Sequence, residues 1–151
     1  MNYKKNTGRE NIKKMKDIEL YVILAKCYNN YDIAYLEPFL DNDIRYGSQW
    51  VLQSLKGKNQ FLKYFKPKLN TIQSSNNPIK AEIGFFNAEQ SLNLELKELI
   101  NVKGEPCIKM YQGGEPQAII LIKQKDGLIN DIHICQVPHY SKAKSTNVFP
   151  K

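Results

Sequence analysis

Beyond Pro78 the sequence is a series of short alternating segments, and this feature constrains the fold more than any other. Apolar and polar residues alternate with the period of a β-strand over residues 79–86, 106–112, 116–124 and 128–137. Gly113-Gly114 and Lys125-Asp126-Gly127 separate the last three segments, and both are typical of hairpin turns. The segment 91–102 also alternates at its start, although its Leu, Glu and Lys favour helix, and we predict a strand there. The second half of the chain therefore predicts an antiparallel sheet.

The first half has the period of helices. Asp17 is a candidate N-cap for a helix that ends at Asn29-Asn30, and Asp32 is a candidate N-cap for a short second helix. Gly57 precedes a third helix, in which Pro67 is expected to cause a kink or a division. Helices followed by strands indicate an α+β domain whose sheet is covered by helices on one face.

The net charge of +7 is confined to the two ends of the chain. Residues 1–16 carry six basic side chains and one acidic one, and residues 138–151 carry three basic side chains and no acid. The body between them carries 13 basic and 14 acidic side chains and is close to neutral. We predict a basic N-terminal tail (1–16), one folded domain (17–137) and a C-terminal tail (138–151). A neutral body argues against a nucleic-acid partner.

The remaining composition excludes several other classes. The longest apolar run, 118–122, is too short to span a membrane, and the basic N-terminus lacks the apolar segment of a secretory signal. Cys27, Cys107 and Cys135 are odd in number and far apart, which favours reduced thiols in the cytoplasm over disulfides. His133 and His139 are the only histidines, and no ligand spacing for a metal is present. We therefore expect no metal and no cofactor.

The segment from Leu36 to Val51 (LEPFLDNDIRYGSQWV), followed by Leu55-Lys-Gly-Lys58, resembles the first half of a nuclear transport factor 2-like (SnoaL-like) domain. Residues 126–132 (DGLINDI) resemble the last turn and final strand of the same fold. The resemblance covers about residues 17–137. It implies three helices packed on a long curved antiparallel sheet that closes into a cone. It also implies a cone that admits a small, often apolar ligand, and a homodimer formed by the outer face of the sheet.

The ketosteroid isomerases of this superfamily use a carboxylate base, a tyrosine and a protonated aspartate. The position of the base falls here at Gly47 or Ser48, and neither residue accepts a proton near neutral pH. The tyrosine position falls near Ile23, and the aspartate position falls within the apolar segment 118–120. The sequence therefore argues against isomerase chemistry and favours a protein without catalytic residues.

Asp131 and His133 are two residues apart on one strand and share a face, so an Asp–His pair is a second catalytic hypothesis. Ser48 or Cys135 would then be its nucleophile. Comparison with the final strand of the family places Ile132, Ile134 and Gln136 inside the cone and the Asp131–His133 pair outside. We therefore expect His133 to be a surface or interface residue.

The first strand, near 44–51, carries Tyr46, Ser48 and Trp50 on one face, which is an unusual choice for a plain apolar core. We predict that these side chains line a ligand cavity. The other predicted lining residues are Phe85, Tyr111, Ile132, Ile134 and Gln136. A largely apolar wall with a few polar groups is typical of small-molecule sites. The aromatic residues can equally fill the cone, and a shift of one residue in register would place them on the outer face.

Two functions follow from the sequence. The first is a domain that binds a small apolar molecule in the cone. The alternative is a non-enzymatic association module, a homodimer or a protein-binding domain that uses the outer face of the sheet.

Overall fold

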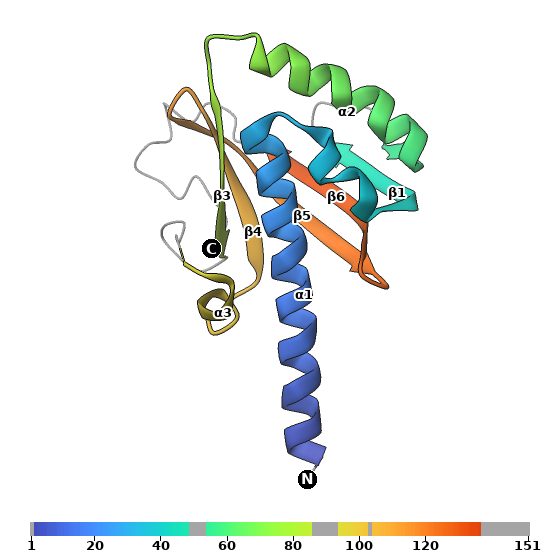
Figure 1. The fold of residues 1–151 in the computed structure, drawn as a ribbon, viewed down its shortest axis with the longest axis vertical. Coiled ribbons are helices and arrows are strands. Elements are labelled where there is room, and N and C mark those ends of the chain that lie inside the picture. The colour runs from blue at the N-terminus through green and yellow to red at the C-terminus, as the bar shows by residue number, and fades with distance from the viewer. Residues whose placement is uncertain (1, 49–53, 86–93, 103, 137–151) are drawn as a thin grey trace.

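The computed structural model describes residues 2–48, 54–85, 94–102 and 104–136. It contains a curved, open sheet with the strand order β2-β1-β6-β5-β4-β3, and α1 and α2 lie over one face of this sheet (Figure 1). The elements in chain order are α1 (Asn2–Asn30), the 3-10 turns η1 (Ile33–Tyr35) and η2 (Glu37–Phe39), β1 (Leu40–Ser48), β2 (Leu55–Lys56), α2 (Lys58–Gln73), β3 (Ile79–Phe85), α3 (Leu96–Leu99), β4 (Pro106–Gln112), β5 (Glu115–Lys125) and β6 (Leu128–Gln136). The α+β class predicted from the sequence is confirmed.

Strands β3 to β6 form the antiparallel meander that the alternating pattern predicts, and two-residue turns connect the last three. Gly113 and Gly114 have φ values of 60° and 83°, and Asp126 and Gly127 have values of 54° and 82°. Positive φ at both central residues matches the right-handed twist of the strands, and glycine adopts it without steric cost. The sheet departs from a wholly antiparallel arrangement at one pair, because β1 runs parallel to β6.

The strand predicted over residues 91–102 is wrong for the part that the structure describes. The main chain forms the short helix α3 there, preceded by Glu95 as its N-cap. Glu95 and Glu98 form a reciprocal capping box, in which each side chain accepts a hydrogen bond from the main-chain N–H of the other residue. The helix propensity of Leu, Glu and Lys, together with this cap, outweighs the short alternation before it. Residues 91–93 lie outside the described part of the chain.

The helical half differs from the sequence prediction at its boundaries. Helix α1 begins at Asn2 rather than at Asp17, so the main chain of the predicted tail continues the helix and projects beyond the sheet (Figure 1). The predicted second helix is only the two 3-10 turns, with Pro38 in the second of them. Helix α2 follows Gly57 as predicted and is not divided, since it continues through Pro67 to Gln73. The extent of the proposed tails as separate regions stays a prediction.

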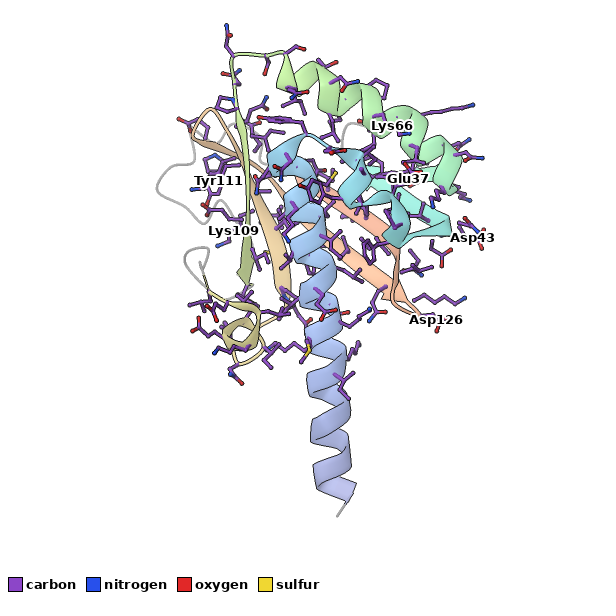
Figure 2. The ribbon with its side chains drawn as sticks, in the orientation of Figure 1. Glu37, Asp43, Lys66, Lys109, Tyr111 and Asp126 are labelled. Atoms are coloured by element: carbon purple, nitrogen blue, oxygen red, sulfur yellow. The ribbon has the colours of Figure 1, made fainter. Side chains whose placement is uncertain are left out.

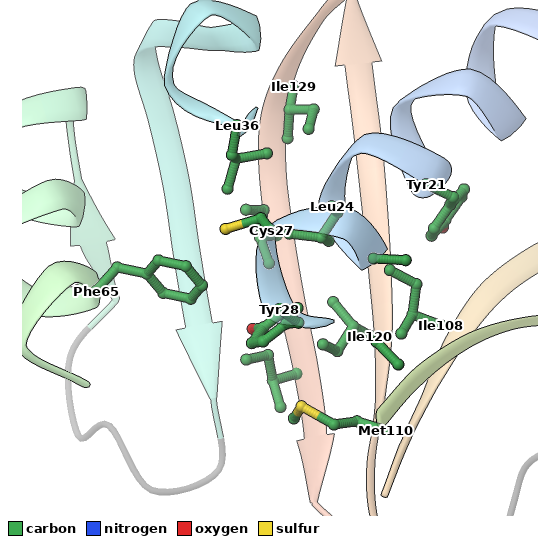
Figure 3. Close-up of a cluster of buried hydrophobic side chains, with 14 of the residues drawn as sticks. Tyr21, Leu24, Cys27, Tyr28, Leu36, Phe65, Ile108, Met110, Ile120 and Ile129 are labelled. Carbon is green, nitrogen blue, oxygen red and sulfur yellow. The ribbon is translucent and has the colours of Figure 1, made fainter. Parts of the chain in front are cut away.

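The core lies between the helices and the concave face of the sheet (Figure 3). Helix α1 contributes Leu24 and Tyr28, α2 contributes Phe65, and the sheet contributes Ile108 and Ile120, all of them 1% exposed or less. Burying a side chain of this size stabilises the fold by roughly 1.5–3 kcal/mol. The ring of Tyr28 meets that of Phe65 edge to face, with 5.4 Å between the ring centroids. These contacts hold α1 and α2 on the same face of the sheet.

Side chains of α1, and that of Tyr31 directly after it, also bind the main chain of the sheet. The Asn29 amide donates a hydrogen bond to the carbonyl of Ala81 (3.0 Å) and accepts one from its N–H (2.7 Å), and the Tyr31 hydroxyl accepts one from the N–H of Ile79 (2.9 Å). Both partners lie on the outer edge of β3. The Tyr21 hydroxyl accepts a hydrogen bond from the N–H of Ile122 on β5 (2.9 Å). Helix α1 is therefore attached to the sheet by polar contacts as well as by burial.

Candidate functional site

Tyr46, the first predicted ligand residue, is packed into the core. It lies on the inner face of β1, is 0% exposed, and stacks obliquely against Phe61 and Tyr64, with centroid distances of 5.4 and 5.3 Å. Burial raises the pKa of the Tyr46 hydroxyl, and Tyr64 raises it further. The two hydroxyls do not reach hydrogen-bonding geometry, and among the described residues the Tyr46 hydroxyl has no hydrogen-bond partner. At this position the aromatic side chains fill the space between sheet and helix.

The other predicted lining residues are distributed over both faces of the sheet. Ile132 and Ile134 are buried in the same core as Tyr46. Phe85 is buried in a smaller cluster with Ile18 and Leu99. Tyr111 projects from β4 on the opposite face, near Lys109 (Figure 2). Ser48 and Gln136 end β1 and β6, but their side chains, and the whole of Trp50, lie outside the described residues. As a ligand site, the predicted set stays a prediction.

A hollow of about 840 Å³ lies elsewhere, between α1, the edge strand β3 and the segment around α3. We call it the α1–β3 groove. Its described lining residues come from α1, η2, β3 and the segment around α3: Glu19, Val22, Ile23, Ala25, Lys26, Asn29, Phe39, Lys80, Ala81, Glu82, Ile83, Leu94, Leu96 and Leu99. Most are apolar, and the volume lies within the range typical of small-molecule sites. None of the eight predicted site residues is among them.

Some of the polar residues of the groove already form an ion pair or hydrogen bonds within the protein. Lys80 and Glu82 form an ion pair of 2.7 Å on the edge strand, and Glu82 raises the pKa of Lys80 through this hydrogen bond. Asn29 uses its amide on the main chain of β3. Glu19 and Lys26 lie one above the other on α1, and no ion pair between described residues includes either of them. The groove therefore offers an apolar wall with one acidic and one basic group beside it.

The sequence could not single out this groove, because its walls come from four segments. On α1 the lining residues recur at intervals of three and four, a pattern that was visible in the sequence. The α3 wall could not be anticipated at all, because a strand was predicted there.

A second hollow, of about 760 Å³, contains the predicted Asp131–His133 pair. It lies where β4 begins, beside β5 and β6, and Lys13, Asp17, Tyr21, Glu105 and Lys123 also line it. His133 is exposed on the outer face of the sheet, where its ring approaches Gly47 of the neighbouring strand. The inward placement of Ile132 and Ile134 and the outward placement of His133 are as expected. Burial raises the pKa of the Cys135 thiol, which makes it a poor nucleophile near neutral pH.

The positions that correspond to isomerase residues carry no groups suited to that chemistry. Ile23 lines the α1–β3 groove, Gly47 lies on the outer face of β1, and Ala118 and Ile120 are buried in the core. Within the described ranges, no three His, Cys, Asp or Glu side chains gather closely enough to hold a metal ion. No helix in the same ranges has the length and apolar character needed to cross a membrane.

The fold can be compared with solved structures. An NTF2-like protein of unknown function from Mesorhizobium loti superposes with a TM-score of 0.59 at 11% identity, over 82% of this chain and 93% of that one. A SnoaL-like protein of unknown function from Burkholderia thailandensis gives a TM-score of 0.56 at 12% identity, over 80% and 93%. This chain has the nuclear transport factor 2-like fold. An LEH-like epoxide hydrolase from M. tuberculosis matches with a TM-score of 0.50 at 12% identity, over 82% and 84%.

At these identities the nuclear transport factor 2-like fold is the only property that the comparison transfers. No protein-family model matches the sequence, and a search of curated proteins finds no match. The superfamily resemblance seen in the sequence is confirmed at the level of architecture. The function has to be argued from the groove and the surface of this chain.

Proposed function

We propose that this protein binds a small, largely apolar molecule in the α1–β3 groove. The observation that carries the proposal is the apolar wall itself, formed by Val22 of α1, Ile83 of β3 and the leucines around α3. Val22, Ile83 and Leu96 are only partly buried and pack against the small cluster that contains Leu99. A ligand that covered them would remove further apolar surface from water, at about 25 cal/mol per Å².

The polar residues of the groove restrict the ligand class. Glu19 and Lys26 lie seven residues apart on α1, or about 10 Å along the helix axis. The four charged residues of the wall, Glu19, Lys26, Lys80 and Glu82, sum to zero. A neutral apolar molecule with few polar groups fits this wall better than a polyanion. The same features support a binding role without catalysis.

A thermal-shift screen tests the proposal. We expect a neutral apolar compound, such as a steroid or a fatty alcohol, to raise the melting temperature, because a ligand that binds only the folded state stabilises it by about 2.7 kcal/mol at a hundredfold excess over its Kd. Leu94 lines the groove and is 40% exposed, so Leu94→Asp should abolish the shift at little cost to folding. Tyr35 is similarly exposed, at 43%, but is not among the described lining residues.

Tyr35→Asp is therefore the matched control and should keep the full shift. The proposal fails if no compound raises the melting temperature of the unmodified protein. It also fails if Leu94→Asp and Tyr35→Asp respond alike, because the ligand would then bind elsewhere.

A further inference from the structure

Strand β3 forms an edge of the sheet (Figure 1), and its residues Ala81 and Ile83 line the α1–β3 groove. In an antiparallel sheet, the main-chain N–H and C=O of one residue point to one side of the strand, and those of the next residue point to the other side. Asn29 binds the N–H and C=O of Ala81, so these two groups point away from β4. The N–H and C=O of Ile83, two residues further along β3, therefore point to the same open side.

The main-chain groups of Ile83 differ from those before them on this edge. Asn29 binds both groups of Ala81, and the Tyr31 hydroxyl accepts a hydrogen bond from the N–H of Ile79. Among the described residues, no side chain binds the outward N–H or C=O of Ile83, and no turn or loop hydrogen bond includes them. Ile83 is partly buried in the wall of the groove. A ligand that pairs with these two groups gains free energy, because unpaired main-chain groups shielded from water are costly.

The contact between Asn29 and Ala81 shows which chemical group fits this edge. One primary amide makes both bonds, since its oxygen accepts from the N–H of Ala81 (2.7 Å) and its nitrogen donates to the C=O (3.0 Å). It can do so because the oxygen and one N–H of a primary amide lie on the same side of the C–N bond. An ester or a tertiary amide has no N–H to donate. A trans secondary amide has its N–H and C=O on opposite sides, so it makes only one of the two bonds.

We propose that the apolar molecule bound in the α1–β3 groove is a primary amide, which accepts a hydrogen bond from the N–H of Ile83 and donates one to its C=O. The inference rests on the proposed function and names the polar end of its ligand. The ligand amide lies about 7 Å from that of Asn29, because outward positions recur every two residues along a strand. The apolar part of the ligand then lies against Val22 and Leu96, which line the same groove. A primary amide is uncharged, as the balanced charges of the wall require.

A ligand series with one constant apolar chain tests the proposal by titration calorimetry on the full chain. We expect octanamide to bind at least about tenfold more tightly than methyl octanoate or N,N-dimethyloctanamide, because neither of these can donate a hydrogen bond to the C=O of Ile83. N-methyloctanamide has both an N–H and a C=O, but on opposite sides of its trans amide bond. It should therefore also bind about tenfold more weakly than octanamide, which separates the required geometry from polarity alone.

Two substitutions of Ile83 test the position of the amide. Ile83→Pro removes the outward N–H but none of the hydrogen bonds to β4, and proline is tolerated on edge strands at such positions. This variant should lose the preference for octanamide over methyl octanoate. Ile83→Val removes one methyl group from the wall and keeps the N–H, so it should bind both ligands more weakly and keep the preference. Circular dichroism checks that each variant is folded.

Nuclear magnetic resonance of the unmodified protein gives a reading that does not depend on whether Ile83→Pro folds. Octanamide should move the N–H signal of Ile83 downfield and leave that of His133, on the outer face of the sheet, unchanged. The inference is overturned if the Ile83 signal does not move, or if the preference for octanamide survives Ile83→Pro.

The ligand series also separates this inference from the proposed function. If octanamide and methyl octanoate bind equally well and Leu94→Asp abolishes the binding of both, the groove binds apolar molecules and the inference about the amide is wrong. If no member of the series binds and no compound of the thermal-shift screen raises the melting temperature, the proposed function fails, and the inference that rests on it fails as well.

Discussion

We expect the stability of this protein to fall steeply in alkali, because five groups that lose protons above pH 9 in an unfolded chain are buried in the folded state. Burial raises the pKa of the Cys27 thiol from 9.0 to about 12 and that of the Cys107 thiol from 9.0 to about 11. Burial also raises the pKa values of Tyr21, Tyr28 and Tyr46 well above 10.0. All five groups stay protonated in the folded state at a pH where the unfolded chain ionises.

The sign of the effect follows from proton linkage. A group whose pKa is raised by folding contributes its full stability below its unfolded pKa and loses it as the pH rises, at about 1.4 kcal/mol per pH unit. The loss therefore begins near pH 9 with the thiols and steepens near pH 10 with the phenols. By about pH 11, ionisation of the two thiols in the unfolded chain lowers the free energy of unfolding by about 5 kcal/mol, and ionisation of the three phenols lowers it by about 4 kcal/mol. The whole free energy of unfolding of a domain is typically only about 5–15 kcal/mol.

Urea unfolding followed by circular dichroism between about pH 7.5 and pH 11 measures this loss. Tyr28→Phe should reduce the slope above pH 10 by about 1.4 kcal/mol per pH unit, whereas Tyr35→Phe, at a 43% exposed position, should leave it unchanged. Tyrosinate absorbance gives an independent reading, since buried phenols should ionise only as the protein unfolds. A free energy of unfolding that stays level to pH 11, or ionisation of all nine tyrosines in the folded protein, would refute the reasoning.

Three further outcomes can be measured by equilibrium unfolding near neutral pH. Asn29→Ala removes both hydrogen bonds to the edge of β3 and should lower the free energy of unfolding by about 1–3 kcal/mol. Asn29→Asp keeps only the acceptor, so its stability should lie between those of the unmodified protein and the alanine variant. An unchanged unfolding midpoint for the alanine variant would contradict this. Tyr21→Phe leaves the Ile122 N–H without its 2.9 Å acceptor and should cost about 1–3 kcal/mol with the far-ultraviolet spectrum preserved. Gly84→Ala would place a Cβ 2.7 Å from the buried Lys109 Cε and should lower the free energy of unfolding by about 1–3 kcal/mol. In a double-mutant cycle, Lys109→Ala should restore about 1 kcal/mol of this loss, because it removes the atoms that clash. If the effects of the two substitutions simply add, the clash is excluded.

Local chemistry determined the parts of the fold that the sequence predicts well. The turn residues Gly113-Gly114 and Asp126-Gly127 identify the strand ends, because few residues adopt positive φ. Gly57 likewise identifies the start of α2. The prediction is wrong around residues 94–102, where a capping box stabilises a helix, and at the start of α1. The main chain of residues 2–16 projects beyond the sheet, and the sequence of this segment carries no apolar stripe like that of residues 18–28.

The candidate site was harder to predict than the strands. The sequence identifies Tyr46 as unusual but does not reveal that Phe61 and Tyr64 of α2 enclose its ring, because α2 and β1 meet only in three dimensions. The α1–β3 groove depends on how far α3 lies from α1 and β3, and no short segment of sequence encodes such a distance. The superfamily pattern predicts the fold, whereas the position of the α1–β3 groove depends on how the side chains of this chain pack.

The parallel pairing of β1 with β6 has a consequence for how the protein is made. Of the strands that the structure describes, β6 is synthesised last, yet it lies between β1 and β5 and joins the two parts of the sheet. While the ribosome is still translating residues 49–127, the two-residue strand β2 is therefore the only described strand with which β1 can pair. Sequence separation of this kind slows folding, because a long loop must close before its contacts form. We infer that the nascent chain completes its sheet only once β6 has left the ribosome, and that truncation before Leu128 yields a chain unable to join its two halves.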